Sequence, residues 1–286
     1  MEIRPYSPPR FDVTDPAGRQ EFARHLQTEG YAVTSPVADP ATLDSLLAGV
    51  WQYIESGSPA RSGRPDTWRD WPAHPECGIM NGNGCGQSAF MWAVRSLPAV
   101  SQAFAAAWDV DPDGLLVSFD GACIFRPWHE RREWRTKAMP FHVDQNAWRP
   151  DRSGFVCVQG MCTLTEANEA TGGLVVVPRS HAAHGEICAG LPHAREWADY
   201  VPVPQHDSAL QAADKGGARM LRLPAGSLVV WDSRTVHCNT PALAPPSAAT
   251  GQPVDALLRA CIYVCMTPRR FARFSTQRRP ALLRQH

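Results

Sequence analysis

The sequence of 286 residues lacks several features that mark particular classes of protein. No stretch approaches the roughly 18 to 20 uninterrupted apolar residues that cross a bilayer, and the N-terminal segment lacks the apolar core of a secretory signal. The 28 basic side chains are balanced by 28 acidic ones, so the chain has no basic excess to attract nucleic acid or anionic membranes. We therefore expect a soluble, cytoplasmic protein with neither nucleic acid nor membrane as a partner.

The nine cysteines also lack the pattern of a disulfide framework or of a zinc site. Their number is odd, no CxxC pair occurs, and several lie within apolar runs. Buried, reduced thiols are therefore expected. Hydrophobic residues make up 44% of the chain, which is ample for a core, and β-rich folds of this size are commonly one domain.

The first third of the chain has the periodicity and the capping signals of helices. Asp15 precedes a proline and an amphipathic pattern that Gly30 ends. The expected elements are a helix over 16–29, a strand over 31–34, and helices over 40–57 and 98–108. Residues 57–88 are rich in Gly, Pro, Ser and Trp without a sustained period, which is typical of a lid or a binding wall. We therefore interpret residues 11–110 as helical support and lid.

From residue 115 onward the sequence changes to short β-type runs bounded by turn residues, such as LLVSFDGACIF, GFVCVQGMCTL and SLVVWD. Short strands at this spacing, mostly without helices between them, favour an antiparallel sandwich or barrel over a parallel βαβ sheet. The prediction is one domain over 1–286, mainly β with flanking helices. Its core spans 115–266, its basic tail spans 267–286, and the Pro/Ala-rich 241–253 is a surface insertion.

The segment Phe141-His142-Val143-Asp144 carries the first chemical signal. In an extended chain, side chains two residues apart share a face, so His142 and Asp144 can both reach one metal ion. A lone HxD is also explained by a surface hydrogen bond. His237 follows in a second β-type segment, and two His with one carboxylate form the facial triad of non-haem Fe(II).

Three further sets of side chains have more than one interpretation. Arg259 begins a predicted strand, where it is either solvated or faces inward and binds a carboxylate of a ligand. Gln159 lies on another strand, as a core amide or as a hydrogen-bonding partner of a ligand. His181 and His184 lie three residues apart, but a structural role is favoured over metal binding.

The order of these motifs resembles the phytanoyl-CoA dioxygenase family of Fe(II)- and 2-oxoglutarate-dependent oxygenases. The motifs are HVDQ from residue 142, TGGLVVVPRSH over 171–181, GSLVVWDSRTVH over 226–237, and Arg259. The resemblance implies a double-stranded β-helix, that is, a cupin-like jelly roll. It also implies iron held by His142, Asp144 and His237.

The resemblance further implies that Arg259 anchors 2-oxoglutarate, with Asn239 near the same carboxylate. The interval between His237 and Arg259 is longer here than in typical members, so Arg234 is a rival anchor. Related halogenases have a small residue in place of the carboxylate ligand. Because Asp144 is present, oxidation is favoured over chlorination.

The expected activity is therefore that of a dioxygenase that consumes O2 and 2-oxoglutarate, with ascorbate as the reductant in vitro. It would oxidise, and most simply hydroxylate, an unactivated C–H bond of a small organic substrate, for example a natural-product or lipid-derived metabolite. Two alternatives remain, a non-catalytic ligand-binding jelly roll and a protein hydroxylase. An apolar or aromatic substrate pocket is favoured by the tryptophans concentrated in the loops before and just after HxD, namely Trp68, Trp71, Trp92, Trp128, Trp134 and Trp148. The sequence leaves the oligomeric state open.

Overall fold

The computed structural model describes residues 1–286 apart from 130, 150–155, 197, 214–215, 245–252 and 272–286. Most of the predicted insertion and of the basic tail therefore lies outside the described residues. None of the described helices is both long and apolar enough to span a bilayer. All nine cysteines are free thiols, and seven of them are buried.

The N-terminal helices begin and end where their capping residues predict. The Asp15 side chain accepts a hydrogen bond from the Gly18 amide, and Gly30 ends the helix with φ 81°, which glycine adopts without strain. The helices are α1 (Pro16–Glu29), α2 (Pro40–Gly57), α3 (Ala89–Arg95), α4 (Pro98–Trp108), α5 (His184–Ala189) and α6 (Ser208–Ala213). The three short helices α3, α5 and α6 were not predicted. Each has only six or seven residues, too few to show a helical period clearly.

The strands form two mixed sheets. The first has the order β1 (Ile3–Tyr6), β11 (Ala218–Leu221), β9 (Gly173–Val176), β13 (His237–Thr240), β7 (His142–Val143) and β10 (Val201–Pro202). The second has the order β2 (Arg10–Phe11), β3 (Tyr31–Thr34), β12 (Leu228–Asp232), β8 (Val158–Thr163), β14 (Arg259–Pro268), β6 (Ala122–Phe125) and β4 (Ile79–Met80), with β5 (Leu115–Val117) paired to β14. The predicted mainly β jelly roll with flanking helices is therefore confirmed.

The N-terminal region contributes more to the sheets than the sequence suggested. Strands β1 and β2 lie in the first eleven residues, where no structure was predicted, and each pairs in parallel with its neighbour. The irregular 57–88 contains two 3₁₀ turns (Pro65–Thr67 and Cys85–Gln87) and the two-residue strand β4. The division of the chain at residues 110 and 115 into support and core stays a prediction.

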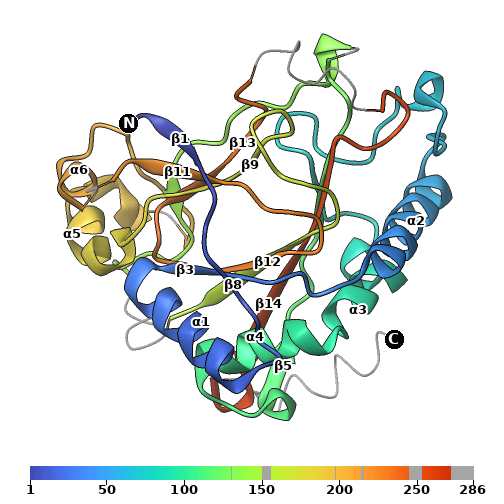
Figure 1. Cartoon of the computed structure of the whole chain (residues 1–286). Helices are drawn as coiled ribbons and strands as arrows, with labels where there is room; N and C mark the ends of the chain where they lie inside the picture. Colours follow the sequence, from blue (N-terminus) through green and yellow to red (C-terminus); the bar gives the residue numbers. More distant parts are fainter. Residues whose placement is uncertain (130, 150–155, 197, 214–215, 245–252, 272–286) are drawn as a thin grey trace, which may run out of the picture.

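The helices cover outer faces and leave the space between the sheets for the site. Helices α1, α3 and α4 lie below the second sheet in Figure 1, whereas α5 and α6 lie at one end of the first. The alternation along β9 shows the two sides: Val175 packs in the small outer cluster with Ile187 of α5, while Leu174 and Val176 belong to the main core. Inward-facing residues of both sheets therefore meet in one interior.

Candidate metal and cosubstrate site

Two adjacent strands bring His142 and His237 face to face. They are directly opposed partners in the antiparallel β7/β13 pair, so their side chains project from the same, inward face. The ring centroids are 4.3 Å apart. Asp144 follows β7 on that face, with Oδ2 3.3 Å from His237 Nε2 and Oδ1 3.7 Å from His142 Nε2. One potential ligand atom from each residue lies within 4.8 Å of the others.

Hydrogen bonds to the main chain fix which nitrogen of each imidazole faces the site. His142 Nδ1 lies 2.8 Å from the Pro140 carbonyl oxygen, and His237 Nδ1 lies 2.9 Å from that of Thr235. A carbonyl oxygen can only accept, so each Nδ1 carries a proton, and Nε2 is the nitrogen that each imidazole can offer to a metal. Two such nitrogens and one carboxylate on one face of a pocket fit a divalent iron ion with open positions for other ligands.

Gln159 contacts the carboxylate of Asp144. Its Nε2 donates to Asp144 Oδ2 over 3.0 Å, while the Asp144 amide donates to the Ser233 carbonyl oxygen. Gln159 therefore orients a candidate metal ligand, a role that the sequence did not reveal. Its Oε1 is buried and has no partner among the described residues, so it can still accept a hydrogen bond from a bound molecule.

Arg259 is a buried cation without an anionic partner among the described residues. It is 1% exposed, and its guanidinium lies 5.0 Å from the centroid of the Phe125 ring. Nη1 donates to Asn239 Oδ1 over 2.6 Å, Nη2 lies 3.4 Å from the sulfur of Met161, and Nε has no partner. Across the described ranges, no carboxylate forms an ion pair with it. Because an unpaired buried charge is costly, this arrangement fits a site for an anionic ligand.

The rival arginine lies elsewhere. Arg234 forms an ion pair with Asp232 at 2.6 Å and lines a different depression, beside α1 and α4. Asn239, in contrast, lies two residues beyond His237 on the inward face of β13 and contacts Arg259 directly. The structure therefore brings together His142, Asp144, His237, Gln159, Asn239 and Arg259 in one pocket, and it leaves out Arg234.

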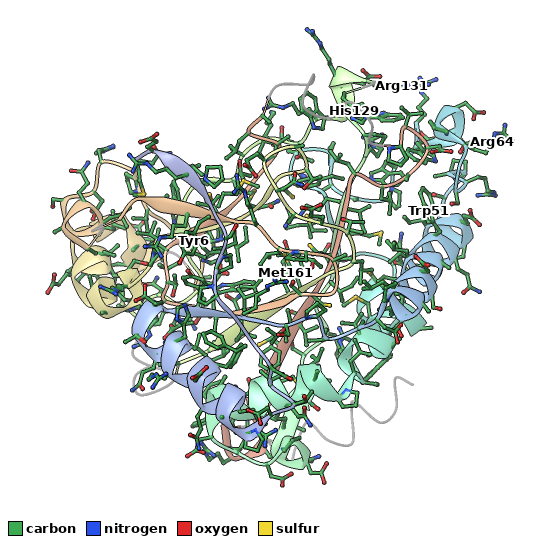
Figure 2. The ribbon with its side chains drawn as sticks, viewed as in Figure 1. Tyr6, Trp51, Arg64, His129, Arg131 and Met161 are labelled. Atoms are coloured by element: carbon green, nitrogen blue, oxygen red, sulfur yellow. The ribbon has the colours of Figure 1, made fainter. Side chains whose placement is uncertain are left out.

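The pocket has a volume of about 610 Å³ and lies between the two sheets. Its walls are largely apolar and include Leu174, Trp231 and Met161, the last labelled in the interior of Figure 2. Tyr200 stacks on His142 with ring centroids 4.7 Å apart. His181 and His184 contact carbonyl oxygens of Gln27 and Gln145 and do not line the pocket. This placement agrees with the structural role that was expected for these two histidines.

The six tryptophans singled out from the sequence do not line the pocket. Trp68, Trp71 and Trp134 form a cluster with Trp51 of α2, which lies at the outer rim of Figure 2. The pocket is largely apolar, as expected, but other residues form its walls. The tryptophan that does line it is Trp231, six residues before His237. Its inward alternation along β12 was the signal that the loop-based argument missed.

The lining also includes Tyr200, Phe119 and Asp120, which the sequence did not single out. Tyr200 precedes the two-residue strand β10, and the other two lie between β5 and β6. Nothing local marks these positions, because they reach the pocket through the pairing of β10 with β7 and of β5 and β6 with β14.

Burial makes the stability of the metal-free protein depend on pH. Burial first, and then the charge of His237, lower the pKa of His142 to about 4, although Asp144 acts in the opposite direction. Unfolded histidine takes up its proton near pH 6.5, whereas the folded protein does so only near 4. Between these values the unfolded state binds more protons, so acidification favours unfolding.

We therefore expect the free energy of unfolding to be unaffected by His142 above about pH 7 and to fall by up to about 3 kcal/mol as the pH falls from 6.5 to 4. Urea unfolding of metal-free wild type and His142→Gln across this range measures the effect. The variant should lose less stability on acidification, and parallel curves would contradict the assignment. His184, whose pKa burial also lowers, contributes equally to both proteins.

The chain is similar to several known proteins. The sequence profile of the family described as phytanoyl-CoA dioxygenase (PhyH) matches residues 26–241. A protein of Aspergillus versicolor named Ava biosynthesis cluster protein O is 33% identical over 196 residues, which cover 66% of this chain. The match spans only 58% of the length of that relative.

Two solved structures illustrate the fold. The epimerase SnoN, in complex with Fe3+, alpha ketoglutarate and nogalamycin RO, has a TM-score of 0.59 and 13% identity, and the match covers 89% of this chain and 85% of SnoN. The carbocyclase SnoK from nogalamycin biosynthesis has a TM-score of 0.59 and 14% identity, over 90% of this chain and 86% of SnoK. At these identities the similarity shows the fold alone.

Proposed function

The chain belongs to the phytanoyl-CoA dioxygenase family of Fe(II)- and 2-oxoglutarate-dependent oxidoreductases, and we propose that it hydroxylates an unactivated C–H bond of a small organic substrate. The observation that carries this proposal is the joint presence, in one pocket, of the His142, Asp144 and His237 group and of a buried guanidinium that has no counter-ion in the described part of the chain. Iron is assigned to the first and the distal carboxylate of 2-oxoglutarate to the second.

When bound, the iron and 2-oxoglutarate supply the activation of dioxygen and the oxidising equivalents, with succinate and carbon dioxide as products. The residues of the chain provide binding, orientation and a dry environment. Arg259 and Asn239 orient the distal carboxylate through charge-assisted hydrogen bonds. The apolar walls at Leu174, Met161 and Trp231 exclude water, which strengthens these interactions.

The substrate class is proposed from the pocket and from the names of related proteins. The Aspergillus versicolor relative is named for a biosynthesis cluster, and SnoN and SnoK act in nogalamycin biosynthesis. A natural-product intermediate is therefore the preferred substrate class, ahead of a lipid-derived metabolite. Epimerisation and ring formation are variants of the same chemistry, selected by which carbon the pocket presents.

The shape of the site favours a small molecule over a protein substrate. A pocket of about 610 Å³ is within the size range of small-ligand sites. A purely ligand-binding jelly roll is the second alternative, but it has no physical need for three convergent metal ligands beside a buried, unpaired cation. The hydroxylase interpretation explains both features.

The test is succinate release. Purified protein with Fe(II), ascorbate and 2-oxoglutarate in air is expected to release succinate slowly without substrate and faster with the correct small molecule. His142→Ala is expected to reduce this release to background, because it removes one of three metal ligands. His206→Ala, which changes an exposed histidine outside the pocket, is the matched control. Equal release by wild type and His142→Ala would refute the function.

A further inference from the structure

One carboxylate that lines the pocket is not needed to balance the charges of iron, 2-oxoglutarate and Arg259. The two positive charges of Fe(II) and the one of Arg259 would balance the charge of Asp144 and the two of 2-oxoglutarate. Among the described lining residues, the remaining ionised side chain is that of Asp120. With iron and cosubstrate in place, Asp120 would therefore be the one lining side chain whose charge no other described lining residue balances.

Asp120 is held at this position by the sheet. It lies in the loop between β5 and β6, which is tied to β14 on both sides: the Ser118 amide donates to the Cys265 carbonyl oxygen over 2.9 Å, and the Tyr263 amide donates to that of Gly121 over 3.0 Å. The Ser118 hydroxyl donates to the Asp120 carboxylate. Cys265, in turn, pairs across the sheet with Gln159, the residue that contacts Asp144.

Arg95 attracts this carboxylate electrostatically but forms no ion pair with it. Arg95 donates to the carbonyl oxygens of Gly86 and Asp120, at 2.6 and 3.5 Å, and lies 5.3 and 5.8 Å from the ring centroids of Trp92 and Phe119. It forms no ion pair with an acidic side chain of the described residues. The carboxylate of Asp120 accepts from Ser118 but has no ion-pair partner among the described residues, so a cationic ligand can still contact it.

The surroundings of Asp120 are aromatic and exposed. Phe119 is 61% exposed and Trp92 is 40% exposed, and their rings meet edge to face with centroids 6.1 Å apart. Phe119 also lines the pocket. Exposed aromatic surface beside a carboxylate suits an organic cation with an apolar body, because both ion pairing and cation–π contacts stabilise it.

We infer that the substrate carries a positively charged nitrogen and that Asp120 selects it. The inference rests on the proposed function, because it assumes that iron and 2-oxoglutarate occupy the inner part of the pocket. It also argues against acyl-CoA substrates, since the several negative charges of CoA would meet no described lining arginine or lysine other than Arg259. Asp120 is thus a specificity-determining residue rather than a catalytic one.

The experiment uses three probes of similar size and different charge: 4-phenylbutylamine, 4-phenylbutan-1-ol and 4-phenylbutyrate. Their dissociation constants are measured anaerobically on full-length protein loaded with Fe(II) and 2-oxoglutarate, by calorimetry. Wild type is expected to bind the amine about tenfold more tightly than the alcohol, and the acid most weakly. Asp120→Asn should reduce the amine preference to about twofold or less, and Asp120→Glu should restore most of it.

Asp44→Asn, the same change on the exposed face of α2, is the matched control and should keep the wild-type preference. The inference is overturned if wild type does not prefer the amine, or if Asp120→Asn keeps the preference. Succinate release in air by the same wild-type preparation tests the proposed function separately. Release without a charge preference defeats only the inference, and a charge preference without release defeats only the proposed function.

Discussion

Arg259→Met is expected to raise the KM for 2-oxoglutarate by about two to four orders of magnitude. Hydrogen bonds between charged groups contribute about 1.5–3 kcal/mol each, and the guanidinium can make two with one carboxylate. Asn239 alone cannot replace the positive charge. The measurement is the dependence of succinate release on 2-oxoglutarate concentration, together with the rise in melting temperature that 2-oxoglutarate gives to the metal-loaded protein.

The same substitution is expected to leave the ligand-free protein as stable as wild type, or more stable. The guanidinium is buried without a counter-ion, and replacing a buried charge by an apolar side chain of similar volume is commonly neutral or favourable. A structural arginine would behave in the opposite way. Unchanged folding with lost binding of 2-oxoglutarate is therefore the signature of a ligand site.

Two further variants make the test specific. Arg259→Lys keeps the charge but loses the planar fork, so its KM should lie between those of wild type and Arg259→Met. Arg234→Gln is the matched control, because that arginine pairs with Asp232 outside the pocket. If Arg234→Gln impaired 2-oxoglutarate binding and Arg259→Met did not, the assignment of the anchor would be wrong.

Local sequence predicted those parts of the fold that local interactions determine. The boundaries of α1 and α2 follow from the caps at Asp15 and Asp39 and from apolar residues at helical spacing. The apolar runs that form β8, β12 and β14 were also long enough to be recognised as strands from the sequence. Strands of two residues, such as β4 and β10, have no period to detect, and they form because a neighbouring strand offers hydrogen bonds.

The candidate site was predictable in its residue types but not in its geometry. HxD places two groups on one face by itself, whereas the meeting of His142 and His237 depends on the pairing of β7 with β13. Only the resemblance to a known family supplied that pairing. The contact of Gln159 with Asp144 and the placement of Asp120 depend on three-dimensional packing, which residue spacing does not encode.

Asp144→Asn is expected to weaken Fe(II) binding, with an effect as large as that of Arg259→Met on 2-oxoglutarate binding. Asp144 is the one anionic group in the His142, Asp144 and His237 set. Burial acts to raise the pKa of its carboxyl group, but hydrogen bonding, including that from Gln159, and attraction by the two histidines in their protonated forms hold this pKa below the ordinary value. An amide of the same shape keeps the packing but loses the charge.

The loss of metal affinity in Gln159→Leu is the reference with which the loss in Asp144→Asn is compared. Removing a group that hydrogen-bonds to a metal ligand typically costs about 10- to 100-fold in metal affinity. Asp144→Asn removes the charged ligand itself, so its loss should exceed that of Gln159→Leu. Anaerobic titration with Fe(II), followed by the rise in melting temperature, measures both. A smaller loss for Asp144→Asn than for Gln159→Leu would mean that the carboxylate serves only to orient the histidines, and the metal would then have to be held by another group.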